Sequence, residues 1–101
     1  MERDAVLSLL KAHERELHDS GVVGASLFGS VARGEATTHD VDVAVRLSNN
    51  FSEPGLNYLS RLAELERRLE DILGRKVDVV EEPTRKKRFQ AEIDRDRAVA
   101  F

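Results

Sequence analysis

The sequence predicts an α/β fold in which helices pack on a small β-sheet, and three observations support this prediction. Helical and strand-like segments alternate along the chain, which is typical of layered α/β domains. The strand-like segments are short runs rich in valine, bounded by glycine or asparagine. The helical segments carry apolar residues at a spacing of three or four. The 101 residues suit one such domain, expected over residues 1–101.

Three helices are predicted from this helical spacing. They are expected over residues 3–19, from residues 52–54 to Gly74, and from residues 83–84 to about residue 95. Their buried faces are expected to contain Val6, Leu10, His13 and Leu17 in the first helix, Leu59, Leu62, Leu65, Leu69, Ile72 and Leu73 in the second, and Phe89 and Ile93 in the third.

Three strands are predicted between these helices. The first is the apolar run at residues 22–28, followed by a Gly-Ser turn, a helical turn at residues 32–34 and a loop at residues 35–39. The second covers residues 41–47, where valine and leucine alternate with polar or small residues. The third covers residues 76–80, with one carboxylate among β-branched residues.

Composition excludes several classes of protein. The net charge of −3 disfavours a general nucleic-acid binder, so no direct nucleic-acid partner is expected. The absence of cysteine excludes disulfides and thiolate metal sites. No apolar run is long enough to span a bilayer, and the charged N-terminus does not resemble a signal peptide. The default expectation is a cytoplasmic protein with no membrane partner.

Three aspartates in the strands are the first candidate site. Asp40 and Asp42 are two residues apart, so their side chains leave the same face of the strand. Two close carboxylates remain ionised most easily around a cation, and Mg²⁺ prefers such oxygen ligands. If the third strand lies beside the second, Asp78 completes a site for two Mg²⁺ ions and can also act as a general base. The alternative for Asp78 is a solvated carboxylate at the sheet edge.

The Gly29-Ser30 turn is the second candidate site. Glycine lets the backbone approach a phosphate closely, and Ser30 adds a hydroxyl donor. Arg33 can add a charge-assisted phosphate contact, although pairing with Glu35 is an equal alternative. A turn that can bind phosphates, next to carboxylates that can bind metal ions, predicts a site for a metal-bound nucleoside triphosphate.

Other polar groups have simpler interpretations. His39 is expected to be an exposed loop residue, and nothing in the sequence places it between Ser30 and Asp40 as a hydrolase triad would need. The basic run at residues 85–88 is expected to be a solvated helix face, with a patch for an acidic partner or RNA as the alternative.

The two sites together resemble the polymerase β-like nucleotidyltransferase superfamily. The resemblance rests on Gly29-Ser30, the nine residues that follow, Asp40-Val41-Asp42 and Asp78. The stretch at residues 28–36 is similar to minimal nucleotidyltransferases that are encoded beside HEPN-domain proteins and act as their antitoxins. This implies an α+β fold with a small mixed sheet, phosphate binding at Gly29 and Ser30, magnesium at Asp40 and Asp42, and catalytic assistance from Asp78. The loop is one residue shorter than is usual in that branch, and His39 stands where a serine is common.

The resemblance implies a Mg²⁺-dependent transfer of AMP from ATP to a hydroxyl group. The short chain leaves no room for an acceptor-binding domain, so the acceptor is expected on a partner, a HEPN ribonuclease toxin silenced by adenylylation of a tyrosine. One alternative is an antitoxin that neutralises its toxin by contact alone. Another is a nucleotide sensor that binds ATP without transferring it.

Overall fold

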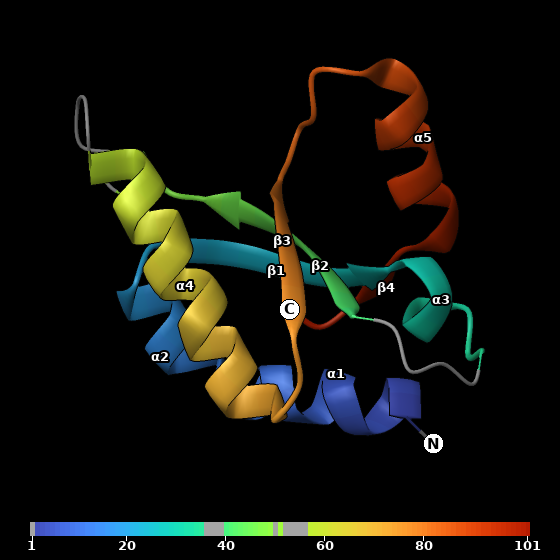
Figure 1. Ribbon diagram of the computed structural model, residues 1–101, viewed down its shortest axis with the longest axis horizontal. Helices are drawn as coiled ribbons and strands as arrows, with labels where there is room; N and C mark the ends of the chain where they lie inside the picture. The colour runs from blue at the N-terminus through green and yellow to red at the C-terminus, as the bar shows by residue number, and fades with distance from the viewer. Residues whose placement is uncertain (1, 36–39, 50, 52–56) are drawn as a thin grey trace.

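A four-stranded mixed sheet forms the centre of the computed structural model, which describes residues 2–35, 40–49, 51 and 57–101. The strand order is β3-β2-β1-β4, with β1 antiparallel to β2 and β4, and β2 parallel to β3 (Figure 1). The strands are β1 (Val22–Phe28), β2 (Val41–Leu47), β3 (Val77–Glu81) and β4 (Ala98–Val99). The three predicted strands are confirmed, the third one residue later than expected, whereas β4 is too short for the sequence to reveal.

Five helices are present among the described residues: α1 (Glu2–Ala12), α2 (Glu14–Asp19), α3 (Gly29–Ala32), α4 (Asn57–Leu73) and α5 (Lys87–Asp96). The helical turn predicted at residues 32–34 lies earlier in the chain, as α3, and residues 33–34 form a turn after it. The second long helix is expected to begin at residues 52–54, which lie outside the described residues. Its predicted end at Gly74 is confirmed, because α4 ends at Leu73 and Gly74 follows with a positive φ.

The prediction of one continuous helix over residues 3–19 is wrong, because the helix is interrupted at His13. The backbone of His13 has a ψ of 16°, outside the helical range. Its ring Nδ1 lies 2.9 Å from the Leu9 carbonyl oxygen, which also accepts the His13 backbone N–H at 3.2 Å. A side chain that competes for a helix carbonyl in this way favours a local break.

The last helix also differs from its prediction, since α5 begins at Lys87 rather than at residues 83–84. The Thr84 backbone N–H donates to Gln90 Oε1 at 2.8 Å, and the Thr84 hydroxyl donates to the Lys86 carbonyl at 3.1 Å. These bonds hold residues 84–86 in a loop that leads into the helix. Phe89 and Ile93 contribute core contacts as predicted.

The two faces of the sheet bury separate clusters of side chains. One face packs against α1, α2 and α4, and its core includes the strand residues Leu27, Val41, Val43 and Val45. The other face carries α5, with Phe28, Ala44 and Ile93 buried together. Alternate residues of β2 point to opposite faces, so Asp42 shares the α5 face with Ala44. The predicted division of this strand into an apolar face and a chemical face is therefore confirmed.

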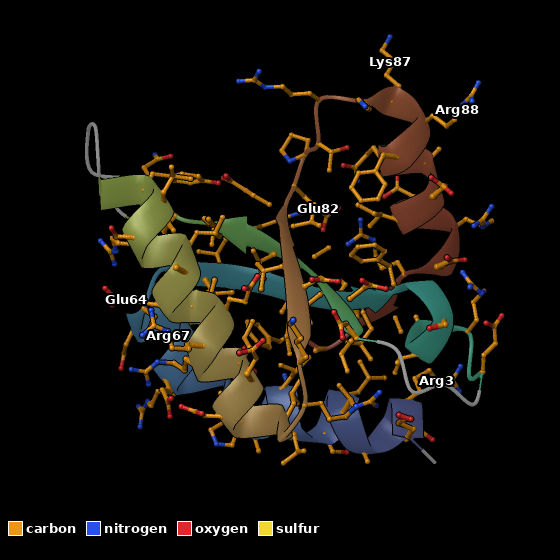
Figure 2. The ribbon with its side chains drawn as sticks, viewed as in Figure 1. Arg3, Glu64, Arg67, Glu82, Lys87 and Arg88 are labelled. Carbon is orange, nitrogen blue, oxygen red and sulfur yellow. The ribbon has the colours of Figure 1, made fainter. Side chains whose placement is uncertain are left out.

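The short helix α3 is anchored on two sides. Its Val31 and Ala32 are buried in the larger core. Arg3 of α1 points toward α3 in Figure 2 and donates from Nη1 to the Ala32 carbonyl at 3.4 Å. Packing and this hydrogen bond hold the turn after β1 in a defined place.

No helix in the described ranges is both long and apolar enough to cross a bilayer.

Candidate functional site

The turn after β1 packs directly against a carboxylate of β2. Gly29 has a φ of +75°, and Phe28, the residue before it, is the register partner of Asp42. A Cβ added at Gly29 would collide with Asp42 Oδ2 and lie 3.3 Å from Asp42 Cγ. Both the backbone conformation and the space exclude a larger residue. The glycine of the predicted phosphate turn thus brings the chain backbone to the predicted metal site.

Asp42 and Asp78 are register partners on the parallel strands β2 and β3. Both side chains leave the sheet on the α5 face, because Val41 and Val77 are buried on the opposite face. Asp40 lies just before β2, where it is half-buried. The structure therefore brings together the two strands that carry these aspartates. Asp78 is exposed on an edge strand, so the alternative of a solvated edge carboxylate describes its surroundings as well.

The electrostatic environment of Asp42 reflects these neighbours. Burial raises the pKa of Asp42, and the negative charges of Asp78 and then Asp40 raise it further. The positive charge of Arg33 acts in the opposite direction. The ionised form of Asp42 is thus less favourable than that of an ordinary aspartate, and a bound cation would offset the repulsion among the carboxylates.

Within the described residues, no three His, Asp or Glu side chains are grouped closely enough to enclose a metal ion. Mg²⁺ does not require such a cage, because it commonly binds through one or two carboxylates and takes its other ligands from water and substrate phosphates. The paired Asp42 and Asp78, the repulsion at Asp42 and the close backbone at Gly29 fit an ion of that kind.

Ser30, the second residue of α3, is half-buried. Its hydroxyl makes no hydrogen bond to any residue that the structure describes, and its carbonyl accepts the Glu35 backbone N–H at 3.0 Å. The hydroxyl is available to a ligand at this turn.

Arg33 is engaged by two carboxylates. Its Nε donates to Glu35 Oε2 at 2.8 Å, and its Nη1 donates to Asp96 Oδ2 at 2.7 Å. Pairing with Glu35 is the alternative expected from the sequence, and the structure shows it. A phosphate contact from Arg33 would require the guanidinium to exchange one of these partners.

Asp96 is a residue of this region that the sequence does not reveal. It is the last residue of α5, its side chain is 7% exposed, and hydrogen bonds from Arg95 and Arg33 lower its pKa. Asp96 and Arg33 are 63 positions apart in the chain, and no local pattern connects them.

Two further predictions concern residues elsewhere. His39 lies outside the described residues. The side chains at residues 85–88 are all exposed, as expected, but only Lys87 and Arg88 belong to the helix; residues 85–86 precede it.

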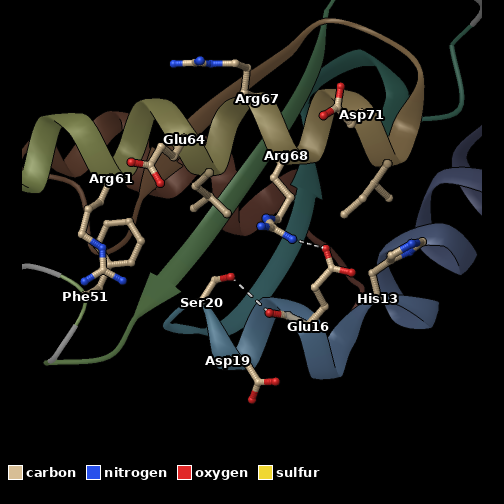
Figure 3. Close-up of a pocket in the computed structure, with 12 residues that line it drawn as sticks. His13, Glu16, Asp19, Ser20, Phe51, Arg61, Glu64, Arg67, Arg68 and Asp71 are labelled. Carbon is tan, nitrogen blue, oxygen red and sulfur yellow. Dashed lines mark hydrogen bonds and ion pairs between the residues drawn. The ribbon is translucent and has the colours of Figure 1, made fainter.

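A groove of about 760 Å³ lies between α2 and α4, on the side of the sheet away from Asp42 and Asp78. Figure 3 shows Arg68 of α4 reaching Glu16 of α2 across it, while Arg61 lies over the Phe51 ring with 5.0 Å from its guanidinium carbon to the ring centroid. The first contact joins α2 to α4, and the second joins α4 to the turn at Phe51. The groove adds nothing to the carboxylate site.

Comparison with known proteins identifies the family. The family model described as a nucleotidyltransferase domain matches residues 9–100. The chain belongs to the nucleotidyltransferase domain family. This nucleotidyltransferase is similar to the protein adenylyltransferase MntA of Thermococcus cleftensis, with 40% identity over 79 residues that cover 76% of this chain and 74% of the relative. The predicted enzyme class is confirmed.

Solved structures agree with this assignment. A protein provisionally described as a minimal nucleotidyltransferase has a TM-score of 0.66 and 34% identity to this nucleotidyltransferase, covering 95% of this chain and 86% of that one. A structure of the MntA-HpeT toxin-antitoxin has a TM-score of 0.65 and 16% identity, covering 100% of this chain and 73% of that one. The second comparison shows the fold alone. The predicted mixed α/β fold and the resemblance to minimal nucleotidyltransferases of the MntA type are confirmed.

Proposed function

We propose that this nucleotidyltransferase transfers AMP from ATP to a hydroxyl group of a partner protein, with Mg²⁺ as cofactor. We further propose that the partner is a HEPN-type toxin, that a tyrosine accepts the AMP, and that the modification silences the toxin. The proposal agrees with the name of the Thermococcus relative, a protein adenylyltransferase. It also agrees with a structural neighbour described as a toxin-antitoxin with AMP-PNP, an ATP analogue. The reaction is assigned to the cytoplasm, where ATP is supplied.

One observation carries the proposal: the Gly29 backbone packs against Asp42, and Asp42 is the register partner of Asp78. This arrangement offers backbone and the Ser30 hydroxyl to phosphates, with two carboxylates beside them. In the proposal, the turn at Gly29 and Ser30 holds the phosphates of ATP, and Asp40, Asp42 and Asp78 hold the metal. Bound Mg²⁺ would neutralise phosphate charge and lower the pKa of a coordinated hydroxyl.

The chain's own groups can account for the proton in this reaction. The acceptor hydroxyl oxygen forms a bond to the α-phosphorus of ATP, and the bond between the α-phosphorus and the bridging oxygen to the β-phosphate breaks. Pyrophosphate leaves, and Asp78, the more exposed of the paired carboxylates, accepts the hydroxyl proton. The turn keeps the nucleotide still while the acceptor approaches from the exposed side at Asp78.

The direct test supplies ATP labelled at the α-phosphate, Mg²⁺ and the purified toxin. We expect label on the toxin with the wild-type protein, and none with the double variant Asp40→Asn, Asp42→Asn or with EDTA. Asp71→Asn, at an exposed position of α4, is the matched control and should retain activity.

The same variants separate catalysis from contact. If the double variant still binds the toxin but no longer protects cells, protection requires the transfer. If it protects as well as the wild type does, the protein is an antitoxin that acts by contact and the catalytic proposal is wrong. ATP binding without label on any toxin would instead indicate a nucleotide sensor.

A further inference from the structure

Four consecutive basic residues form an exposed corner of the molecule where α5 begins. We name this surface the basic corner: Arg85, Lys86, Lys87 and Arg88. All four side chains are exposed, and Figure 2 shows Lys87 and Arg88 extending away from the rest of the protein. The corner concentrates positive charge on a chain whose net charge is −3.

The charges of the basic corner are not balanced within the structure. Among the described residues, no carboxylate pairs with any of its four side chains, whereas Arg68 pairs with one carboxylate and Arg33 and Arg97 with two each. The first turn of α5 contains no acidic residue. Cations at a helix N-terminus oppose the helix dipole, and neighbouring like charges repel. The basic corner therefore destabilises α5, and folding alone does not account for it.

A groove of about 520 Å³ adjoins the basic corner and contains apolar and aromatic groups. Tyr58, Val80, Pro83 and Phe89 contribute to its lining, and Arg85 and Lys86 lie at the same groove. The Tyr58 hydroxyl is occupied because it donates to Glu81, so the ring is the group left for a ligand. The groove can take an apolar side chain while the cations hold anionic groups next to it.

The position of this groove relates it to the catalytic face. Val80 follows Asp78 by two residues on β3, so both side chains lie on the α5 face. Two residues along a strand span roughly 7 Å. A chain bound in the groove can continue toward Asp78 without leaving that face of the sheet.

We propose that the basic corner and its groove dock an acidic segment of the protein that accepts the AMP, with one apolar side chain of that segment in the groove. The proposal rests on the proposed function, since it assigns the surface that holds the acceptor. Charge complementarity supports an acidic protein segment as the occupant. RNA is the less suitable ligand because the overall charge of the chain is negative and Glu81 lines the same groove.

The test measures binding of a fluorescein-labelled peptide, in which glutamates flank one phenylalanine, by fluorescence anisotropy without ATP. We expect the charge-reversal variant Lys87→Glu, Arg88→Glu to bind the peptide about tenfold more weakly, and rising salt to weaken wild-type binding. The matched control Arg15→Glu, Arg67→Glu changes the net charge equally at exposed positions of α2 and α4 and should bind as the wild type does. The milder variant Lys87→Gln, Arg88→Gln should show an intermediate loss.

Two outcomes would overturn the inference: equal peptide affinity of the charge-reversal variant and the wild type, or tighter binding of a single-stranded RNA of the same length at the basic corner. Binding of MgATP, measured without peptide, separates this inference from the proposed function. If the wild-type protein binds the peptide but not MgATP, the proposed function is rejected and the docking surface is kept. If the wild-type protein binds MgATP but not the peptide, only the docking surface is rejected.

Discussion

Gly29 has two reasons to be glycine, and they can be separated experimentally. Its φ of +75° disfavours any side chain, and Asp42 occupies the space that a Cβ would need. Gly34 has nearly the same φ, +76°, but a Cβ there would meet no described residue within 4 Å. Gly34 thus provides a control for the backbone conformation alone.

We predict that Gly34→Ala lowers the free energy of unfolding by about 1 kcal/mol, the cost of a positive φ. Gly29→Ala should cost roughly 2–4 kcal/mol, since overpacking against Asp42 adds to that cost. Urea unfolding measures both values, and calorimetry should show MgATP binding lost only in Gly29→Ala. Equal destabilisation by the two variants would mean that the contact with Asp42 has no energetic effect.

Asp42 is expected to reduce the stability of the protein when no metal is bound. Because its pKa is raised in the folded state, the ionised carboxylate opposes folding. This loss of stability is absent at pH values below the ordinary pKa of an aspartate. It is complete at pH values above the raised pKa of Asp42 in the folded protein. Asp42→Asn should therefore increase the free energy of unfolding at neutral pH in EDTA, and the gain should disappear as the pH falls to about 4.

The measurement is a comparison of urea unfolding curves for the wild type and Asp42→Asn across this pH range. A variant less stable than the wild type at neutral pH would show that Asp42 is stabilised by contacts rather than strained by repulsion.

At the scale of elements, α5 is held on the sheet by a buried ion pair. Glu82, which follows β3, is 6% exposed and accepts two hydrogen bonds from Arg97, one of them 2.9 Å long. Arg97 also donates to Ser26 Oγ in β1 at 3.1 Å, and Gln90 of α5 donates to Glu82 at 2.8 Å. The hydrogen bond from Arg97 is the main reason that the pKa of Glu82 is lowered. This cluster ties Gln90 of α5 and Arg97, which follows α5, to Glu82 and to β1. Asp96, the last residue of α5, separately accepts a hydrogen bond from Arg33.

We predict that Glu82→Gln lowers the free energy of unfolding by about 2–4 kcal/mol at neutral pH, since it leaves a half-buried guanidinium without its charge partner. A lowered pKa means that the stabilisation is present above the ordinary glutamate pKa and is lost as the pH falls through the folded value. The difference in the free energy of unfolding between Glu82→Gln and the wild type should therefore become smaller at acid pH. Thermal unfolding monitored by circular dichroism at several pH values measures it, and a difference that does not depend on pH would contradict the assignment.

At the scale of the whole molecule, the candidate site exists because distant segments meet. The helix α4 connects β2 to β3 and lets these strands pair in parallel, which places Asp78 beside Asp42. The antiparallel pairing of β1 with β2 adds the turn at Gly29. Ligands that bind at such a junction stabilise the whole fold, because they bind the folded state only.

We predict that MgATP at a hundredfold excess over its Kd stabilises the protein by about 2.7 kcal/mol. For a domain of this size the melting temperature should rise by roughly 10 °C or more. The double variant Asp40→Asn, Asp42→Asn should lose most of this rise, whereas Asp71→Asn should keep it. Differential scanning fluorimetry is sufficient, with ATP in EDTA as a further control. An unchanged melting temperature of the wild type would contradict nucleotide binding.

The sequence by itself determined the strands at residues 22–28 and 41–47, the chemical face of the second strand and the glycine turn before it. These features depend on residues that are near one another in the chain: alternation of valine with aspartate assigns the faces of a strand, and Gly29 marks a turn. Only the tertiary structure decided that β4 covers the edge of β1 and that Asp96 engages Arg33. The physical reason is distance along the chain, because such contacts depend on how the packed elements meet and leave no periodic pattern in the sequence.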